Sequence, residues 1–227
     1  MSEAVNPMAD ERAAVRPVMA AFDFDGTLTR SDTLLPFLRR LLGLPTLLWV
    51  LFICSPWLVA YVLRLVSNHR AKAVLLHAAL AGRSVADVER CAQAFVLEYL
   101  PQQWRPWGLQ QLVQHQQAGH RCVLVTASTS PYMHLVGASL GVDAVLCTEM
   151  EVVDGRYTGR LATANCHGEE KVARLKAWLT QAYGAAPDHQ PEVHAYGDTK
   201  GDWPMLRLAQ QAWYREKPGT TMKLSRE

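Results

Sequence analysis

The 227-residue sequence contains little cysteine and comparatively little charge. Its five cysteines are an odd number and none lies in a Cys-x-x-Cys pair, which argues against a disulfide framework and a structural zinc site and favours a reducing compartment. Charged residues make up 19% of the chain, below the usual figure of about 25%, whereas hydrophobic residues make up 49%. This composition excludes an intrinsically disordered protein and predicts a chain with a hydrophobic core.

The sequence also lacks a large net charge and an apolar N-terminal segment. The 23 Lys and Arg residues and the 21 Asp and Glu residues leave a net charge of +2, too small to indicate nucleic-acid binding, and we expect no nucleic-acid partner. The first residues include Glu3, Asp10 and Glu11 and no hydrophobic run, so they do not form a secretory signal. We therefore predict a flexible tail over residues 1–16 and a cytoplasmic protein.

Short apolar runs alternate with amphipathic segments along most of the chain. A short apolar run bounded by turn residues is typical of a buried parallel strand. The sequence predicts strands at 18–22, 121–125, 144–147 and 193–196, with helices at 107–120 and 170–183. Strands that alternate with helices indicate an α/β fold with a parallel sheet. We also expect a small hairpin at 152–161 that turns at Asp154-Gly155.

The span 32–105 lacks this alternation and is predicted to be helical throughout. Within it, residues 41–63 carry no charge. Pro45 and Pro56 are expected to divide this stretch, because proline breaks a helix. The piece over 45–55 would then be about 17 Å long at 1.5 Å per residue, shorter than the ~30 Å hydrocarbon core of a bilayer. We interpret the span as a helical insert between the first two strands.

Polar side chains follow the ends of the predicted strands, where ligands bind in open α/β sheets. They are Asp23 and Asp25 after the first strand, Thr126 after the second, Lys171 at a helix start, and Asp198 with Asp202 after the strand at 193–196. Clustered carboxylates repel one another unless a hard cation lies among them, and such a site suits Mg²⁺. A lysine, a hydroxyl and helix N-terminal amides suit phosphate. Together these groups indicate phosphoryl transfer.

Four motifs resemble, in order, those of haloacid dehalogenase-superfamily phosphatases: FDFDGTLT, VTAS, Lys171 in GEEKV, and GDTKGDWPML. The resemblance covers about residues 18–206. Within the superfamily, the sequence is most similar to subfamily IB, the phosphoserine-phosphatase-like branch. It implies a Rossmann-like parallel-sheet core formed by residues 17–31 and 106–227. An all-helical cap domain would be inserted at 32–105.

The resemblance further implies a Mg²⁺-dependent phosphomonoester hydrolase that forms an aspartyl-phosphate intermediate. Asp23 would be the nucleophile and a Mg²⁺ ligand, and Asp25 would be the general acid and base and would offer its backbone carbonyl to the metal. Thr126 and Ala127 would bind the phosphate. Lys171 would neutralise the charge of the nucleophile and the phosphate.

The resemblance also assigns the remaining carboxylates. Asp198 would ligate Mg²⁺, and Asp202 would support the ion or its waters. Two positions depart from phosphoserine phosphatases, since Ala127-Ser128 replaces a Gly-Gly pair and Asp32 replaces a Glu. Asp32 is therefore either a substrate-binding residue or the N-cap of the next helix.

The apolar stretch is similar to the cap of bacterial phosphatidylglycerophosphatase C, a member of the same superfamily. The substrate is therefore predicted to be either a small phosphorylated metabolite or a lipid phosphate such as phosphatidylglycerophosphate. A single membrane crossing is excluded on this interpretation, because it would separate Asp23 from Lys171. Either the cap packs its apolar faces internally, or residues 41–66 contact the inner membrane peripherally at its cytoplasmic face. In the second case anionic lipid would be attracted by the neighbouring cations Arg39, Arg40, Arg64, Arg70 and Lys72.

A second class of function remains beside the enzyme. The chain could be a non-hydrolytic phospho-acceptor or a membrane-surface binding module that keeps the cleft without turnover. A protein that only stores phosphate needs no acid two residues after its acceptor, and this chain has Asp25 there. The sequence therefore favours the hydrolase.

Overall fold

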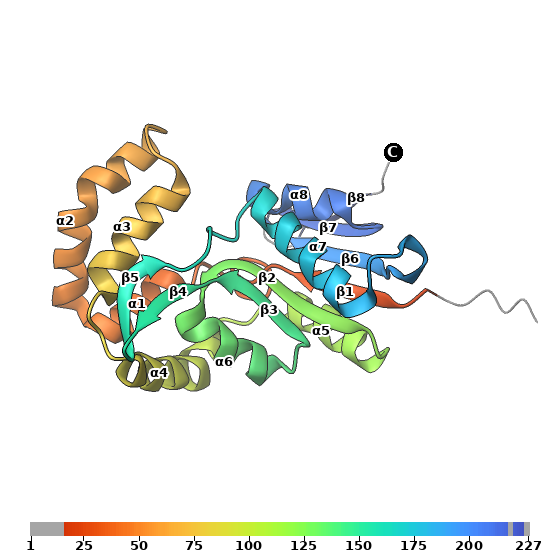
Figure 1. The fold of residues 1–227 in the computed structure, drawn as a ribbon, viewed down its shortest axis with the longest axis horizontal. Coiled ribbons are helices and arrows are strands. Elements are labelled where there is room, and N and C mark those ends of the chain that lie inside the picture. Colours follow the sequence, from red (N-terminus) through yellow and green to blue (C-terminus); the bar gives the residue numbers. More distant parts are fainter. Residues whose placement is uncertain (1–15, 218–219, 225–227) are drawn as a thin grey trace, which may run out of the picture.

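The computed structural model describes residues 16–217 and 220–224 (Figure 1). The tail predicted over residues 1–16 lies outside the described residues except for its last position. All the predicted strands and helices of the core are present, and the α/β class is confirmed. The chain forms a parallel-sheet layer with helices on both faces and a separate group of helices at one end (Figure 1).

The main sheet has six strands in the order β3-β2-β1-β6-β7-β8. Its strands are β1 (Val18–Phe22), β2 (Arg121–Thr129), β3 (Ala144–Thr148), β6 (Glu192–Gly197), β7 (Gln211–Lys217) and β8 (Thr220–Leu224). The pairs from β3 to β7 are parallel, and β8 adds to β7 antiparallel. Strand β1 pairs in parallel with β2 on one side and with β6 on the other, so the carboxyl ends of these three strands meet at one edge.

Both faces of the sheet are buried, which explains the continuous apolar runs in its strands. In β1, Ala20 and Phe22 pack with α5 (Pro106–Gln117) and α6 (Ser130–Leu140). Met19 and Ala21 pack on the opposite face with residues of α7 (Glu169–Tyr183) and α8 (Trp203–Leu208). Figure 1 shows these two helices beside β6 and β7. Burying a side chain the size of Phe22 contributes about 2 kcal/mol. Successive side chains of β1 therefore point to opposite faces of the sheet, and both faces are filled by hydrophobic packing.

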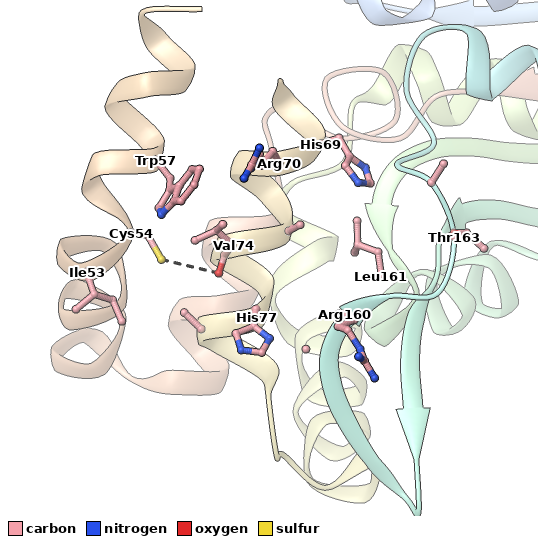
Figure 2. Close-up of a pocket in the computed structure, with 14 residues that line it drawn as sticks. Ile53, Cys54, Trp57, His69, Arg70, Val74, His77, Arg160, Leu161 and Thr163 are labelled. Atoms are coloured by element: carbon pink, nitrogen blue, oxygen red, sulfur yellow. Dashed lines mark hydrogen bonds between the residues drawn. The ribbon is translucent and has the colours of Figure 1, made fainter. Parts of the chain in front are cut away.

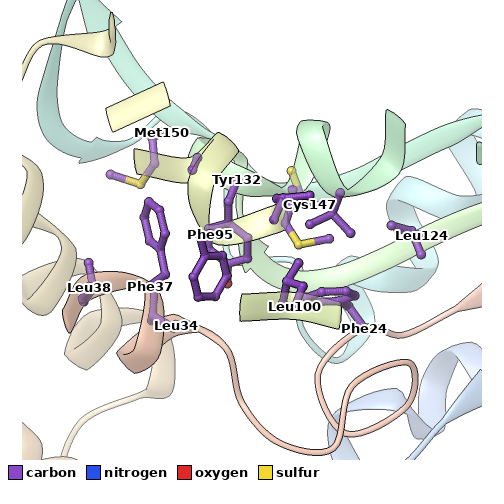
Figure 3. Packing of buried hydrophobic residues seen from close by; sticks show 14 of the residues in the cluster. Phe24, Leu34, Phe37, Leu38, Phe95, Leu100, Leu124, Tyr132, Cys147 and Met150 are labelled. Atoms are coloured by element: carbon purple, nitrogen blue, oxygen red, sulfur yellow. The ribbon is translucent and has the colours of Figure 1, made fainter. Parts of the chain in front are cut away.

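The residues after β1 form the group of helices at the end of the molecule. They are α1 (Leu34–Leu42), α2 (Leu44–Val62), α3 (Asn68–Leu80) and α4 (Val85–Ala94), followed by a π-helical turn (Phe95–Tyr99) and a 3-10 turn (Leu100–Gln102). Their apolar side chains join the cluster that covers one face of the sheet. Figure 3 shows Phe37 and Phe95 against Tyr132 of α6, with ring centroids 4.8 Å and 5.6 Å from that of Tyr132. The helical insert and the sheet therefore share one hydrophobic cluster.

A hairpin of β4 (Met150–Val153) and β5 (Arg156–Leu161) packs on this helical group although it follows β3 in sequence. The predicted turn is confirmed, because Asp154 and Gly155 both adopt positive φ, 49° and 71°. Gly159 has φ of 80°, and a Cβ there would lie within 2.9 Å of His77 and Ala81. Only glycine therefore permits this close approach of β5 to α3.

Helix α2 is continuous over 19 residues, and the prediction that Pro56 divides it is wrong. Proline removes the N–H that would bind the carbonyl of Phe52, but the Ser55 hydroxyl donates to that carbonyl at 2.7 Å. Pro45 lies in the first turn, where a proline costs no hydrogen bond. At 1.5 Å per residue α2 is about 28 Å long. It is long and apolar enough to cross a membrane by length and composition, with a mean hydropathy of 1.8.

A buried histidine beneath the sheet should make stability depend on pH. His115 of α5 contacts the Tyr196 hydroxyl through Nε2 and His120 through Nδ1, both at 2.8 Å. Burial, together with the nearby charges of His194 and His120, lowers the pKa of His115 from 6.5 to about 4. A group whose pKa is lower in the folded state stabilises the fold above its unfolded pKa and loses that contribution as the pH falls toward its folded pKa.

We therefore expect the free energy of unfolding to fall by about 3 kcal/mol on account of His115 as the pH drops from 6.5 to 4. Urea unfolding at several pH values measures this loss. In His115→Gln the decline should be shallower by that amount, because glutamine does not titrate. An equal decline in both proteins would contradict the assignment.

Candidate active site

The turn after β1 brings Asp23 beside the loop that follows β6. Gly26 adopts φ of 81°, and a Cβ on it would lie 2.0 Å from Oδ2 of Asp198. Thr27 faces both carboxylates, with its hydroxyl 3.5 Å from Asp23 and 3.4 Å from Asp198. The glycine is required here because no larger residue leaves room for Asp198.

Lys171 lies in the first turn of α7 and points into the same cluster. Its ammonium donates to Oδ1 of Asp23 at 2.6 Å and to Oδ1 of Asp202 at 2.5 Å, and all three side chains are buried. Burial alone lowers the pKa of Lys171, but the two carboxylates outweigh burial and raise it above its ordinary value. Burial and the charge of Asp202 raise the pKa of Asp23, against the effect of Lys171. Lys171 is therefore a permanent cation between two acids.

Asp202 is occupied by partners from the chain itself. Its Oδ2 accepts hydrogen bonds from the backbone N–H of Asp198 at 3.2 Å, from the N–H of Thr199 at 2.9 Å and from the Thr199 hydroxyl at 2.7 Å. With Lys171 on Oδ1, both oxygens of Asp202 are used. These donors hold the pKa of Asp202 below its ordinary value although burial opposes them. Asp202 thus fixes the loop after β6 and the lysine.

The three carboxylates of Asp23, Asp198 and Asp202 each place an oxygen within 4.8 Å of the others. Burial and the nearby charge of Asp202 raise the pKa of Asp198 to about 6. Asp23 and Asp202 are buried and Asp198 is half-buried, and such a cluster of carboxylate oxygens has the chemistry of a site for a hard divalent cation. Asp23 and Asp198 are the two members with oxygens available for such a cation.

Asp25 lies two residues from Asp23 but in a different environment. Its Oδ1 accepts from the N–H of Thr33 at 2.8 Å and from the Thr33 hydroxyl at 2.6 Å, and its Oδ2 accepts from the Ser128 hydroxyl. The hydroxyl of Tyr132 contacts both Thr33 and Ser128, at 3.0 Å and 2.9 Å. Burial and the charge of Asp32 raise the pKa of Asp25 to about 6. A carboxyl with this pKa can exchange a proton near neutral pH.

The remaining predicted residues surround this pair. Thr126 is buried at the β2 end of the site and accepts a hydrogen bond from the N–H of Ser128 at 3.0 Å. The carbonyl of Ala127 accepts hydrogen bonds from Lys72 and, at 2.8 Å, from the Thr148 hydroxyl. Asp32 accepts a hydrogen bond from the N–H of Leu34 at 2.9 Å and lines the site. The N-cap of α1 is Thr33, so the N-cap interpretation of Asp32 is wrong by one residue, and its role in substrate binding stays a prediction.

One cavity of about 550 Å³ gathers these side chains between the sheet edge and the helical group. It is lined by Asp23, Asp25, Asp32, Thr126, Ala127, Lys171 and Asp202 from the prediction, and Asp198 lies beside it against Gly26. The helical group contributes the opposite wall, made by Leu34, Leu58, Tyr61, Asn68, Ala71, Lys72 and Leu75. The eight predicted residues therefore lie together, at the junction of two parts of the chain.

Sequence reasoning missed three residues of this site. The Thr33 hydroxyl contacts Asp25 directly, and the Tyr132 hydroxyl contacts it indirectly through Thr33 and Ser128. Neither residue belongs to a sequence motif. Lys72 extends from α3 to the Ala127 carbonyl, and burial lowers its pKa. A signal for Lys72 was present, because Asn68, Ala71, Lys72 and Leu75 follow helical spacing and place one charge on a buried face.

Comparison with known proteins gives the same architecture. The profile of haloacid dehalogenase-like hydrolases matches residues 20–207. Protein CicA of Caulobacter vibrioides is 35% identical over 213 residues, which are 93% of this chain and 91% of that protein. A histidinol-phosphatase of Neisseria meningitidis is 28% identical over 139 residues, 59% of this chain and 60% of that protein.

Solved structures share the fold. A protein of unknown function from Bordetella pertussis superposes with a TM-score of 0.71 at 23% identity, over 87% of this chain and 89% of that one. A substrate-bound phosphoserine phosphatase superposes with a TM-score of 0.60 at 15% identity, over 88% and 85%. The family match spans both the sheet and the inserted helices, and the chain belongs to the haloacid dehalogenase-like hydrolases.

Proposed function

We propose that this protein is a phosphatase that hydrolyses phosphomonoesters through an aspartyl-phosphate on Asp23, in the phosphoserine-phosphatase-like subfamily IB. The observation that carries the proposal is a pair of carboxyl groups two residues apart, of which one contacts a cation and the other only neutral hydrogen-bond donors. Asp23 contacts Lys171, whereas Asp25 is held by three hydroxyl and amide donors and has a pKa near 6. The names of the histidinol-phosphatase and phosphoserine phosphatase relatives support a phosphomonoester substrate.

In the first step an oxygen of Asp23 attacks phosphorus and the bond to the leaving oxygen breaks. Lys171 lies 2.6 Å from Asp23 and offsets the charge of the nucleophile and the phosphate. Asp25, in its protonated form, donates its proton to the leaving alcohol. Thr126 and Ala127, near the carboxyl end of β2, bind the phosphate oxygens.

In the second step water attacks the phosphorus of the aspartyl-phosphate. Asp25, now ionised, accepts a proton from that water, and the bond from phosphorus to Asp23 breaks to release phosphate. Thr33 and Ser128 keep the Asp25 carboxyl at one place through both steps. The same carboxyl thus serves as acid and then as base.

Mg²⁺ is the proposed cofactor, because the oxygens of Asp23 and Asp198 and the nearby Asp202 fit a hard cation. When bound, it would offset the negative charge that otherwise keeps a carboxylate and a phosphate apart. Asp198 is held in place for this role by Thr27 and by the space that Gly26 leaves. Asp202 holds the loop and Lys171, so its support of the metal is indirect.

We propose a lipid phosphate such as phosphatidylglycerophosphate as the substrate, in preference to a small phosphorylated metabolite. The cavity wall from the helical group is largely apolar and has Lys72 as its cation. The outer surface of α2 and the turn after it is also apolar, since most of the exposed large hydrophobic side chains of the described chain lie there: Leu44, Leu48, Trp49, Phe52, Ile53, Trp57, Val59, Tyr61, Val62, Leu63 and Leu65. Soluble proteins rarely leave so large an apolar patch uncovered.

This apolar surface is the proposed site of peripheral contact with the inner membrane at its cytoplasmic face. Arg39, Arg40, Arg64 and Arg70 are exposed near it and would attract anionic lipid. Helix α3 packs antiparallel to α2 and returns the chain to the core (Figure 1). Helix α2 can therefore lie on the bilayer surface while the catalytic residues stay together in water.

The test of this function is phosphate release from phosphatidylglycerophosphate in mixed micelles, compared with phosphoserine and histidinol phosphate in solution. The proposal predicts a value of kcat/KM for the micellar lipid at least about a hundredfold above those of the soluble esters. A higher value for a soluble ester would assign the protein to small metabolites instead.

Polar substitutions on the outer face of α2 should separate membrane contact from catalysis. Trp49 and Phe52 are 62% and 67% exposed, so serine at both positions removes apolar surface without opening the core. We expect Trp49→Ser with Phe52→Ser to lower activity on micelles about tenfold or more and to leave activity on a soluble ester unchanged. Leu97→Ser is the matched control, because Leu97 is 75% exposed but lies outside α2. Equal losses on both kinds of substrate would contradict the membrane role.

Lys72 should contribute to substrate binding from the cap side. A charge-assisted hydrogen bond contributes about 1.5–3 kcal/mol, so Lys72→Met should lower kcat/KM about 10- to 100-fold, chiefly through KM. Lys72→Arg keeps the charge and should restore part of the loss. Steady-state kinetics with one substrate measures both variants. Values of kcat/KM within twofold of the natural protein would exclude a role in binding.

A further inference from the structure

A second cavity of about 650 Å³ lies outside the active site, between α2, α3 and β5 (Figure 2). We call it the cap groove. Its apolar wall includes Ile53 and Trp57 of α2, Val74 of α3 and Leu161 of β5. None of its lining residues belongs to the catalytic cavity. The groove is therefore a separate place for a ligand.

The ionisable side chains that line the cap groove are all basic or imidazole groups apart from the Cys54 thiol. They are His69, Arg70, His77 and Arg160, and no carboxylate lines the groove. Arg70 stacks over the ring of Trp57 at 5.1 Å, and Figure 2 shows the two side chains facing each other between α2 and α3. Within residues 16–217 and 220–224, Arg70 forms no ion pair. Its guanidinium is therefore available to an anion.

Two further donors point to the same preference. Nδ1 of His69 accepts a hydrogen bond from the N–H of Asn165 at 3.4 Å, which leaves Nε2 as the N–H donor of that ring. His77 lies against Gly159 and offers a second imidazole. Arg160 is paired with Glu151 at 2.8 Å, and His77 lies about two helical turns further along α3, so the anion site rests on Arg70 and His69.

A ligand that matches these walls carries an anionic group and an apolar chain on the same molecule. Free phosphate would satisfy the donors but leave Ile53, Val74 and Leu161 in contact with water. The groove is also continuous with the exposed apolar side chains of α2, since Ile53 and Trp57 belong to both surfaces. A phospholipid can enter from a bilayer on that side and bring its phosphodiester to Arg70.

We propose that the cap groove binds one anionic phospholipid of the bilayer, with its headgroup phosphate at Arg70 and His69 and an acyl chain along Ile53, Trp57 and Leu161. This lipid is a bound anchor and not the substrate, because the groove lies apart from Asp23 and Lys171. The proposal goes beyond the phosphatase function and does not require turnover. The groove would bind one lipid molecule specifically, whereas the exposed arginines alone would attract any anionic membrane surface.

A short-chain anionic lipid below its micelle concentration tests the groove apart from any membrane surface. We would titrate dihexanoyl phosphatidylglycerol into the full-length protein by calorimetry, and repeat the titration with Lys72→Met, which changes the catalytic cavity but not the groove and should leave this binding unchanged. One saturable site is expected. Two control ligands should each bind at least about tenfold more weakly. They are dihexanoyl phosphatidylcholine, which has the same chains but no net charge, and glycerophosphoglycerol, which has the headgroup but no chains.

Arg70→Gln should weaken binding of dihexanoyl phosphatidylglycerol about tenfold, because it removes one charge-assisted contact. Arg64→Gln is the control: Arg64 is also exposed beside α2 but does not line the groove. Equal affinity in Arg70→Gln and the natural protein, equal weakening in both variants, or the absence of a saturable site would each overturn the proposal. Because activity on a soluble phosphomonoester is measured separately, loss of the groove and failure of the phosphatase function give different results.

Discussion

Replacing Asp23 by asparagine is expected to abolish phosphate release, by roughly four orders of magnitude or more, while the fold is retained. The amide has no anionic oxygen to attack phosphorus and no carboxylate for a cation. The fold should persist because Lys171 keeps its second partner, Asp202. In addition, the neutral amide avoids the free-energy cost of burying a charged carboxylate, the cost that raises the pKa of Asp23. Phosphate release and thermal unfolding measure the two properties.

The matched control for this substitution is Asp188→Asn. Asp188 is an exposed aspartate in the turn before β6 and lies outside the cavity. It should keep full activity, which shows that removal of a carboxylate alone has no effect. Turnover of Asp23→Asn at the rate of the natural protein would remove Asp23 from the mechanism.

Replacing Lys171 by methionine is expected to damage both stability and catalysis. The substitution leaves Asp23 and Asp202 buried without their cation, and removal of one partner of a buried ion pair costs about 3–5 kcal/mol. The free energy of unfolding in urea, measured without added metal, should fall by about that amount. The same variant should lose about a thousandfold in kcat with Mg²⁺ present, because the ammonium that offsets the charge on the nucleophile and phosphate beside the cation is missing.

A double variant distinguishes the two effects. Lys171→Met with Asp202→Asn removes one of the unpaired carboxylates, so much of the lost stability should return. Activity should not return, because the cation beside Asp23 is still missing. If activity recovered together with stability, the loss in Lys171→Met would come from unfolding and Lys171 would have no direct role.

The positions of Asp23, Thr126 and Asp198 could be predicted from the sequence because each directly follows a short apolar run, although β2 continues through Thr126 to Thr129. Parallel strands bring such residues to one edge, whatever the details of the loops. The buried pairing of Lys171 with Asp23 and Asp202 depends on how α7 packs, and the sequence contains only its helical pattern. The contacts of Asp202 with Lys171 and the loop were not predicted for the same reason, and its support of a metal stays a prediction.

Other features depend on contacts that a single sequence does not encode locally. The continuity of α2 through Pro56 results from one hydroxyl, that of Ser55, which satisfies the carbonyl that proline leaves free. The network from Tyr132 to Asp25 joins residues 107 positions apart through Thr33 and Ser128. The hairpin of β4 and β5 packs on α3 because Gly159 permits close approach, although its place in the sequence lies within the core. Each depends on tertiary packing that overrides the local pattern.

The proposed hydrolase and a non-hydrolytic phospho-acceptor differ in the fate of one covalent bond. Both would place phosphate on Asp23, but only the hydrolase uses Asp25 to activate the water that removes it. The aspartyl-phosphate should therefore form and decay within each turnover. In a phospho-acceptor it would persist and no phosphate would be released.

The most direct test is to trap this bond during turnover of a phosphomonoester with Mg²⁺. Rapid acid quenching followed by borohydride reduction converts an aspartyl-phosphate to homoserine, which peptide mass spectrometry locates. The account predicts homoserine at position 23 that forms at least as fast as phosphate is released and is absent from Asp23→Asn. Steady phosphate release with no modification at position 23, or with modification at another carboxylate, would contradict it.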